Sequence, residues 1–227
     1  MSMKETLPAR YISRVEYLRE QCRGRRVLHL GCSSGQFLQD RLERGSLLHA
    51  VLAEEAGELY GVDVDEASLE TMRGMGFHHL HHGNVEELDA LNLPETFDVV
   101  VAGDLLEHIT RPGAMLDGVK RFLRKAGRFI VSTNNAFGLH YQLRRWSGGY
   151  REHPEHVSFF SPETLVHLFE RHGYRLEAMF GAYTEPPHTW RQHFAFAIGR
   201  PLFRLAPVLA GTLIVSAEPH TSQLPSA

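Results

Sequence analysis

The chain has 227 residues, of which 43% are hydrophobic and 22% charged, and its formal net charge is −3. This balance is typical of a globular domain with one sizeable core, and it gives no basic surface of the kind that binds nucleic acid. We therefore expect a single domain over residues 1–227 with no nucleic-acid partner. The longest apolar stretch, residues 201–217, contains Arg204, two prolines and a glycine, so we expect no membrane span.

Cysteine usage predicts a reducing environment. Cys22 and Cys32 flank the first predicted strand, where a bridge between them is unfavourable, and no paired zinc motif occurs. The N-terminal residues contain no apolar run of the signal-peptide type. A cytoplasmic location is the expectation that fits both observations.

Hydrophobic spacing predicts alternating helices and strands along the first part of the chain. Apolar residues after Pro8 recur with helical spacing, which predicts a helix over residues 8–22. Strands are expected at 26–30, 58–64, 77–83, 97–103 and 128–133, and helices at 35–45, 47–57, 65–76 and 111–127. Such alternation indicates βαβ units, a parallel sheet and an α/β fold.

The pattern changes after Thr133. Residues 134–160 are rich in loop-forming, aromatic and arginine residues, and a helix over 161–173 opens with a Ser161 cap and Pro162. Two further strands, 174–183 and 211–219, surround a mixed helical insert, and residues 218–227 are expected to form a loose tail.

A glycine turn follows the first strand, in the stretch VLHLGCSSG at 27–35. Gly31 and Gly35 would let the backbone approach a ligand, and the next helix would point free N–H groups at it. The dinucleotide fingerprint GxGxxG is absent, so the turn alone is a weak signal. Asp63 at the end of the second long strand strengthens it, because a carboxylate there can accept both ribose hydroxyls. The alternative for Asp63 is a helix cap, for which Asp65 is the better candidate.

The next two strands also end in polar residues. Asn84 could bond an adenine amine, and Val64 and Val85 could enclose the ring. The strand at 97–103 is followed by Asp104, Glu107 and His108, a set that favours a functional interpretation.

This series resembles the class I S-adenosylmethionine-dependent methyltransferases over residues 8 to about 217. The resemblance is carried, in order, by VLHLGCSSG, LYGVDVDEASL, HHGNVEEL, FDVVVAGDLLEHI, KRFLRKAGRFIVSTNN and HVSFFSPETLVHLFERHGYRL. It implies a Rossmann-like, mostly parallel sheet of seven strands in the order 3-2-1-4-5-7-6, with the last strand antiparallel and helices on both faces. Within the family, the chain is most similar to the ubiquinone-pathway-like and the sugar- or natural-product-modifying branches.

The resemblance also implies a cofactor site for S-adenosylmethionine, with S-adenosylhomocysteine as product. By position, Gly31, Cys32, Ser33 and Gly35 would line the methionine moiety, and Asp63 would bind the ribose. The adenine would be surrounded by Val64, Asn84 and Val85, and the sulfonium would be approached by Asp104 and Leu105. Tyr11, on a helix over the site, would reach the methionine carboxylate. Two positions depart from the family: His29 stands where an acid is usual, and Ser33 where a glycine is usual. A neutral histidine can accept a hydrogen bond but brings no counter-charge.

The implied reaction is methyl transfer to a small-molecule acceptor, and we expect the hydroxyl of a sugar or secondary metabolite. A hydroxyl must lose its proton, and histidine suits that role. Our candidate catalytic residues are His108, His156 and Asp104. His108 could instead tie down the following loop, and His156 could dock residues 158–162 on the sheet. Residues 134–160 are interpreted as a substrate lid, or as an amphipathic helix packing Tyr141 and Trp146 on the body.

Metal binding is not expected. Asp104, Glu107 and His108 resemble an ExxEH motif that holds a divalent ion in some ubiquinone-pathway O-methyltransferases, but aspartate shortens the reach. The tract HHLHH at 78–82 alternates between two faces of a strand and is expected at the sheet edge. Two alternative functions stay open: a non-catalytic cofactor-binding or scaffold protein of the same fold, and a nicotinamide-dependent enzyme, which the missing GxGxxG disfavours.

Overall fold

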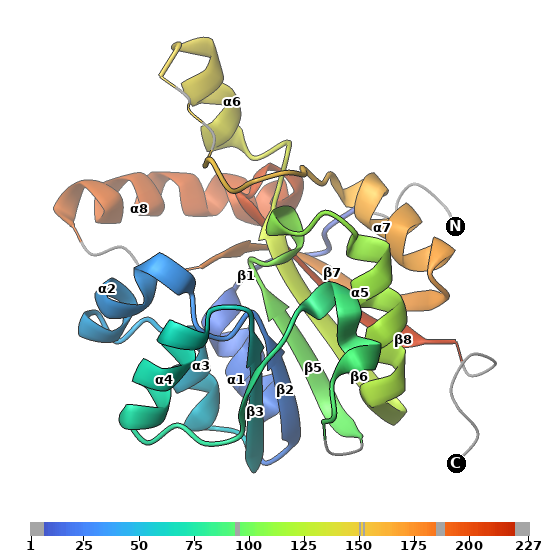
Figure 1. The fold of residues 1–227 in the computed structure, drawn as a ribbon. Coiled ribbons are helices and arrows are strands. Elements are labelled where there is room, and N and C mark those ends of the chain that lie inside the picture. Colours follow the sequence, from blue (N-terminus) through green and yellow to red (C-terminus); the bar gives the residue numbers. More distant parts are fainter. Residues whose placement is uncertain (1–6, 94–95, 150, 152, 185–188, 221–227) are drawn as a thin grey trace.

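The structure is a computed structural model that describes residues 7–93, 96–149, 151, 153–184 and 189–220 (Figure 1). Within these residues one sheet contains eight strands in the order β1-β7-β8-β6-β5-β2-β3-β4. The strands are β1 (Tyr11–Ser13), β2 (Arg26–Leu30), β3 (Glu58–Asp63), β4 (Leu80–His82), β5 (Phe97–Gly103), β6 (Leu123–Asn134), β7 (Tyr174–Tyr183) and β8 (Thr212–Pro219).

The predicted strand order is confirmed, with one strand added. Without β1, the order is that of the seven-stranded sheet described above, and β8 runs antiparallel to both β6 and β7. The added strand β1 pairs in parallel with β7, where Tyr11 lies opposite Gly181. The prediction of a helix from residue 8 is therefore wrong for residues 11–13. The helix begins later because the Ser13 side chain accepts a hydrogen bond from the Glu16 N–H and caps it there.

The helices are α1 (Arg14–Cys22), α2 (Leu38–Glu43), α3 (Leu48–Ala53), α4 (Glu66–Gly74), α5 (Pro112–Val119), α6 (Leu139–Trp146), α7 (Pro162–Arg171) and α8 (Trp190–Leu205). Short 3₁₀ turns lie between them: η2 (Gly35–Phe37), η3 (Val85–Ala90), η4 (Leu106–His108), η5 (Lys120–Phe122) and η6 (Pro207–Leu209). None of the helices in the described part of the chain is long and apolar enough to cross a membrane.

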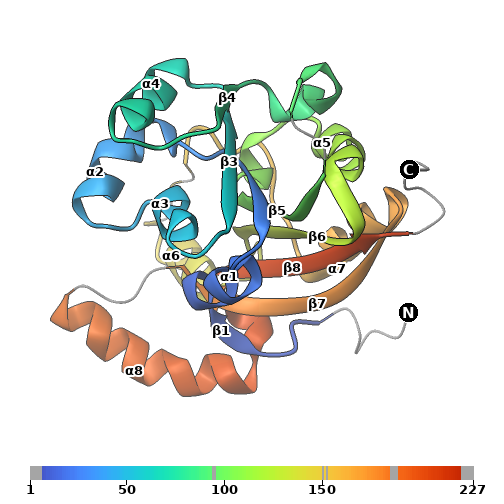
Figure 2. The ribbon, with the colours of Figure 1, turned by 90° about the horizontal axis from the view of Figure 1, so that it is seen from below.

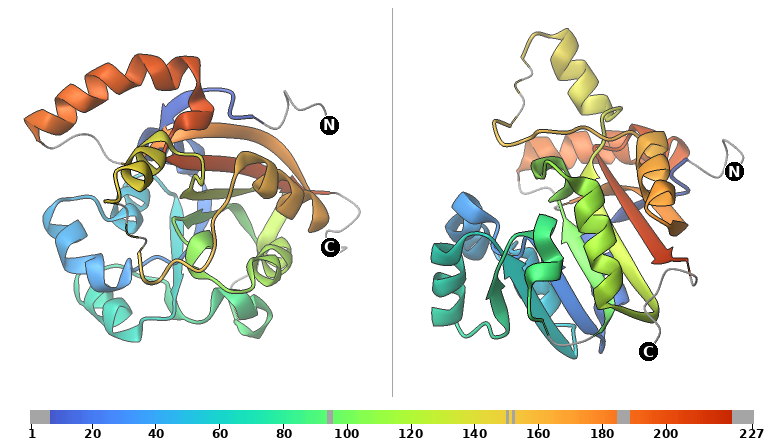
Figure 3. Two further views of the ribbon diagram at one scale, coloured as in Figure 1. Left: turned by 90° about the horizontal axis from the view of Figure 1, so that it is seen from above. Right: turned by 45° about the vertical axis from the view of Figure 1, so that its right-hand side comes forward.

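Helices cover both faces of the sheet, as predicted (Figures 2 and 3). On one face α5 and α7 pack Met115 and Phe169 into the largest apolar cluster, which includes Phe129 of β6. On the other face α1 and α3 pack against β5, with Leu18 buried in the same cluster as Val99. Consecutive residues from Val99 to Ala102 of β5 thus enter opposite clusters, which is why this part of the strand is apolar without interruption.

Three predicted element boundaries are wrong. The helix expected over 111–127 ends with η5, because Leu123 already pairs with Phe97 as the first residue of β6. The strand expected at 77–83 is confined to β4. The expected tail 218–227 begins too early, because Glu218 and Pro219 belong to β8 and pair with β7; residues 221–227 lie outside the described residues.

Residues 134–160 divide into a packed part and an exposed part. The Tyr141 hydroxyl donates a hydrogen bond to Asn134 Oδ1 at 2.9 Å, which ties the start of α6 to the end of β6. Trp146 at the other end of α6 is 81% exposed, and the helix stands away from the body (Figure 1). The interpretation that Trp146 packs on the body is therefore wrong, whereas the lid interpretation stays a prediction.

The histidine tract lies at the sheet edge on β4, as predicted. His79 and His81 stack on the Tyr60 ring, with centroids 4.5 and 6.0 Å away. His82 Nε2 instead lies 3.1 Å from the Val64 carbonyl oxygen. His82 thus lies apart from the other two, and among the described residues the tract forms no group that could hold a metal ion.

The predicted cap of α7 is confirmed. The Ser161 side chain accepts from the Thr164 N–H, and the Thr164 side chain accepts from the Ser161 N–H. Replacing Ser161 with alanine should lower the free energy of unfolding by about 1 kcal/mol, because one helix N–H loses its partner. Urea unfolding of Ser161→Ala checks this, with Ser161→Asp as the control that keeps a capping oxygen. Equal stability of the alanine variant and the wild type would contradict the assignment.

Candidate active site

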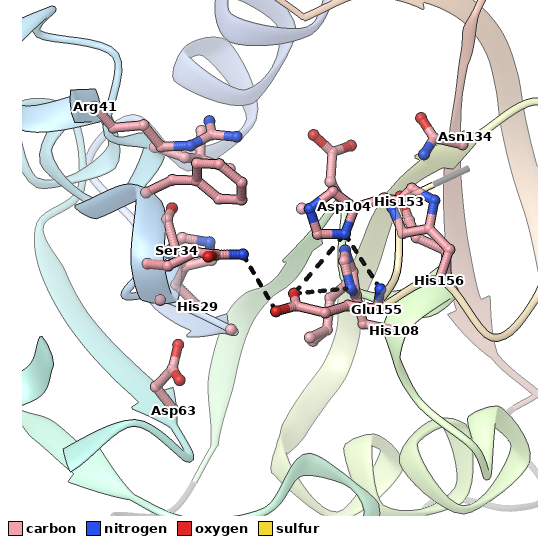
Figure 4. Close-up of a pocket in the computed structure, with 18 of the residues that line it drawn as sticks. His29, Ser34, Arg41, Asp63, Asp104, His108, Asn134, His153, Glu155 and His156 are labelled. Carbon is pink, nitrogen blue, oxygen red and sulfur yellow. Dashed lines mark hydrogen bonds and ion pairs between the residues drawn. The ribbon is translucent and has the colours of Figure 1, made fainter. Parts of the chain in front are cut away.

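A cavity of about 420 Å³ opens at the carboxyl ends of the central strands (Figure 4). Gly31, Asp63, Gly103 and Asn134, which end or directly follow β2, β3, β5 and β6, all contribute to its wall. The chain proceeds from β2 to β3 on one side and places β5 on the other, so the strand order reverses at this point. Open α/β sheets bind ligands at such a reversal.

The turn after β2 needs glycine at its first position. Gly31 has a φ of +68°, and a Cβ there would lie 2.9 Å from Leu105 Cδ1. Ser34 also has a positive φ, of 65°, so this position, and not Ser33, takes up the backbone strain of the turn. Ser33 is fully buried, and its hydroxyl accepts a hydrogen bond from the Gly35 N–H at 3.1 Å. Ser33, at the position where the resemblance implies a glycine, therefore stabilises the turn through this buried hydrogen bond.

Asp63 holds the same turn against β3. Its Oδ2 accepts from the Ser33 N–H at 2.8 Å, and its Oδ1 accepts from the Asp65 N–H at 3.1 Å. Each oxygen keeps a further lone pair, and the side chain lines the cavity. Asp65 caps α4 by accepting from the Ser68 N–H, so the helix-cap alternative for Asp63 is wrong.

His29 forms a buried pair with His49 of α3. The two Nδ1 atoms are 3.3 Å apart and the rings are stacked. Burial lowers the pKa of both imidazoles, that of His49 to about 4 and that of His29 well below its ordinary value, where the His49 charge adds to the effect. Nε2 of His29 is buried without a partner among the described residues, and His29 lines the cavity. A neutral imidazole, with one nitrogen that has no partner among the described residues, thus occupies the position at which the resemblance implies an acid.

Asp104 is held by a buried cation. Arg14, the first residue of α1, donates to Asp104 Oδ2, and the Ser132 hydroxyl donates to Oδ1 at 3.0 Å. Burial favours the neutral acid, but the Arg14 charge and these hydrogen bonds outweigh it and lower the pKa of Asp104. A carboxylate held in this way is a weak proton acceptor.

Glu107 also lines the cavity, but its hydrogen bonds and the direction of its pKa shift differ from those of Asp104. Its Oε2 accepts from the Thr133 hydroxyl at 2.7 Å, and its Oε1 is buried without a partner in the described part of the chain. Burial, with a smaller contribution from the Asp104 charge, raises the pKa of Glu107 to about 7.

Three imidazoles gather at the opposite side of the cavity from Asp63 (Figure 4). The His108 and His156 rings are 4.7 Å apart, centre to centre, and the His153 ring is 5.2 Å from that of His156. Glu155 lies beside them, with Oε2 3.9 Å from His108 Nδ1. Burial and then the His156 charge lower the pKa of His108, although the nearby Glu155 carboxylate opposes this.

Of the predicted site residues, the structure brings seven to the cavity wall: Gly31, Gly35, Asp63, Asp104, Leu105, His108 and His156. The other six do not line it. Cys32 and Val85 are buried in apolar clusters, and Ser33 is buried under the turn. Asn84 caps η3 through the Glu86 N–H, and Val64 is 61% exposed. Tyr11 lies in β1 against the rings of Tyr183 and Phe203.

Several wall residues carried no clear signal in the sequence. They are Arg14, Gln36, Phe37, Arg41, Leu48, Asn134 and Glu155. Arg14 follows Tyr11 by three residues, so an N-terminal segment does reach the site, but through a different residue. Its partner Asp104 is 90 residues away, and spacing alone cannot reveal such a pair.

The buried histidine pair predicts a loss of stability in acid. Unfolded histidine takes up protons below about pH 6.5, whereas folded His49 stays neutral until about pH 4, so the free energy of unfolding falls as the pH drops through this interval. His49 alone should contribute a loss on the order of 2 kcal/mol between pH 7 and pH 5. Urea unfolding at both pH values should show a smaller loss in His49→Gln. The exposed-histidine control His78→Gln should behave as wild type, and an undiminished loss in His49→Gln would contradict the assignment.

Comparisons with known proteins agree with this geometry. A family profile described as a methyltransferase domain matches residues 3–179. Ubiquinone biosynthesis O-methyltransferase of Aeromonas salmonicida is 25% identical over 72% of this chain and 68% of its own, and that of Xylella fastidiosa is 28% identical over 78% and 72%. A solved S-adenosylmethionine-dependent methyltransferase of Archaeoglobus fulgidus shares the fold with a TM-score of 0.56, 21% identity and 90% coverage of both chains. The chain therefore belongs to the class I S-adenosylmethionine-dependent methyltransferases.

Proposed function

We propose that the protein transfers the methyl group of S-adenosylmethionine to a hydroxyl oxygen of a small-molecule acceptor. The observation that carries this proposal is the division of one cavity into two parts. One side presents the glycine turn and the strand-end carboxylate of Asp63, and the other presents His108, His153, His156 and Glu107. A cofactor on the first side would bring its methyl group toward proton-accepting groups on the second.

The hydrogen-bonding groups on the first side of the cavity match those of the cofactor. Asp63 would bind the ribose hydroxyls through its unused lone pairs, while Gly31 and Gly35 leave room for the methionine moiety. The unpartnered His29 Nε2 would bond the ammonium as an acceptor or the carboxylate as a donor, depending on which Nδ1 of the histidine pair carries the proton. Val64, Asn84 and Val85 stay the predicted surroundings of the adenine.

S-adenosylmethionine supplies a methyl carbon already activated by the adjacent sulfonium. The protein's own contribution is to align the acceptor oxygen and to accept its proton. Among the predicted catalytic residues, the imidazoles of His108 and His156 suit proton acceptance better than Asp104, whose carboxylate is neutralised by Arg14. Glu107 is an additional candidate because it has a free buried oxygen at the same wall.

The choice of oxygen as the methylated atom rests on two supports. The curated relatives from Aeromonas salmonicida and Xylella fastidiosa are O-methyltransferases by name. A hydroxyl, unlike a free amine, needs a base close to the methyl donor, and this cavity contains several. The class of hydroxyl compound, sugar or secondary metabolite, stays a prediction from the sequence resemblance.

Cofactor binding should depend on Asp63. Loss of two hydrogen bonds to a charged acceptor predicts binding of S-adenosylhomocysteine about 100-fold weaker in Asp63→Ala. Calorimetric titration checks this. Asp63→Asn, which keeps one acceptor oxygen for the Ser33 N–H, separates ligand contact from loss of the turn, and Asp89→Asn at the exposed end of η3 is the control. Unchanged affinity in both Asp63 variants would contradict the assigned ribose site.

Methyl transfer is tested by incubating the protein with S-adenosylmethionine and a panel of phenolic, polyhydroxy and amine acceptors, with the methylated atom identified by NMR. We expect methyl ethers. In His156→Gln, kcat should fall by about 100-fold or more, because a proposed proton acceptor for the hydroxyl is lost. S-adenosylhomocysteine should still bind, because His156 lies on the other side of the cavity from Asp63 (Figure 4). Methylation at nitrogen or carbon only, or cofactor binding without any product, would contradict the proposed function.

A further inference from the structure

His108, His153 and His156 come from two separate segments. His108 ends η4, directly after β5, whereas the other two lie in the loop between α6 and α7. One nitrogen of each ring can be chosen so that all three lie within 4.8 Å of one another, and all three side chains are partly buried. Within the described residues, no other group of three histidine, cysteine or acidic side chains has this arrangement.

Backbone hydrogen bonds already hold the two segments together. The Val157 N–H donates to the Glu107 carbonyl oxygen at 2.9 Å, which fixes the loop beside η4. Within the loop, the His156 N–H donates to the His153 carbonyl oxygen at 3.0 Å. These backbone bonds therefore hold the three rings close together. Little further ordering of the loop would be needed for all three to bind one ion.

Glu155 supplies negative charge at the same place. Its Oε2 lies 3.9 Å from His108 Nδ1 and 4.0 Å from His153 Nδ1, and its Oε1 accepts from the Gln36 amide at 3.3 Å (Figure 4). These distances are too long for hydrogen bonds to the rings, but a carboxylate at this place would offset part of the charge of an ion.

We propose that His108, His153 and His156 bind one divalent ion of the late transition series, for which zinc is the best match. Three protein ligands with one open position is a common arrangement for mononuclear zinc, and imidazole favours zinc, copper or nickel over magnesium or calcium. Zinc–nitrogen bonds of about 2.0–2.1 Å place tetrahedral ligands about 3.4 Å apart. Side-chain rotation that moves each ligand nitrogen by roughly 1 Å would bring the observed arrangement to that spacing.

This site differs from the acidic motif recognised in the sequence. In that motif Asp104 and Glu107 would be oxygen ligands, but Asp104 is paired with Arg14, and Glu107 is bonded to Thr133. Only His108 belongs to both sets. The nitrogen-rich set predicts a different ion from the magnesium-like ion that two carboxylates would favour, and it reverses our expectation that no metal binds.

An ion at this place would fasten the loop carrying His153 and His156 to the end of β5, in the wall of the cavity. Its open position could take the acceptor oxygen, a consequence that rests on the proposed function. Metal binding itself does not. A nitrogen that coordinates the ion cannot also accept a proton, so coordination and proton acceptance are alternative roles for His108 and His156.

The test uses untagged protein that has been stripped of metal and then titrated with Co²⁺, whose tetrahedral complexes absorb strongly in visible light. We expect one Co²⁺ per chain, displaced by one Zn²⁺, with metal content after dialysis confirmed by mass spectrometry. The double variant His153→Gln/His156→Gln should bind at least about 100-fold more weakly. The variant His78→Gln, in the histidine tract, should bind as wild type does.

Three results would overturn the proposal: no stoichiometric uptake by the wild type, equal uptake by the double variant, or loss of uptake in His78→Gln, which would assign the metal to the histidine tract. Circular dichroism verifies that the variants are folded, and the single variant His153→Gln replaces the double variant if the latter is not. S-adenosylhomocysteine titration of the same samples keeps the two proposals distinguishable. Cofactor binding without metal uptake would overturn the metal site alone.

Discussion

The site depends on the register of three neighbouring parallel strands. Leu30 at the end of β2 lies opposite Val62 of β3 on one side and Ala102 of β5 on the other, so the three strands end at the same level. The next residues, Gly31, Asp63 and Gly103, line the same cavity, and Asp104 directly follows Gly103 there. Burial of β5 on both faces fixes this register, because a slip of one residue would exchange its apolar contacts between the two cores.

The features that could be predicted from the sequence are those with a local physical signal. The apolar run within residues 97–103 located β5, and Ser161 together with Pro162 located the start of α7. Asp63 could be assigned to the cavity because its position at a strand end decides where it lies. The alternation of elements predicted a parallel sheet, and the strand order followed from the resemblance to the family. Neither predicted β1, whose partner β7 is about 170 residues away in the chain.

The rest depends on long-range pairing that spacing does not encode. The sequence gives no indication that Arg14 meets Asp104, or that Glu155 lies beside His108. Cys32 and Ser33 do not line the cavity, for a different reason: the turn after β2 buries both side chains, whereas its glycines and Ser34 contribute to the cavity wall. The two departures from the family also prove to be supported locally, His29 by His49 and Ser33 by its bonds to Asp63 and Gly35.

The central claim is that this cavity is the cofactor site, with methyl transfer directed toward the histidine side. A crystal structure of the protein with S-adenosylhomocysteine tests it most directly. We expect the ribose hydroxyls on Asp63, the homocysteine end beside Gly31 and His29, and the sulfur directed toward Asp104 and the three imidazoles. A ligand bound outside this cavity, or bound with its ribose away from Asp63, would contradict the assignment of the cofactor site.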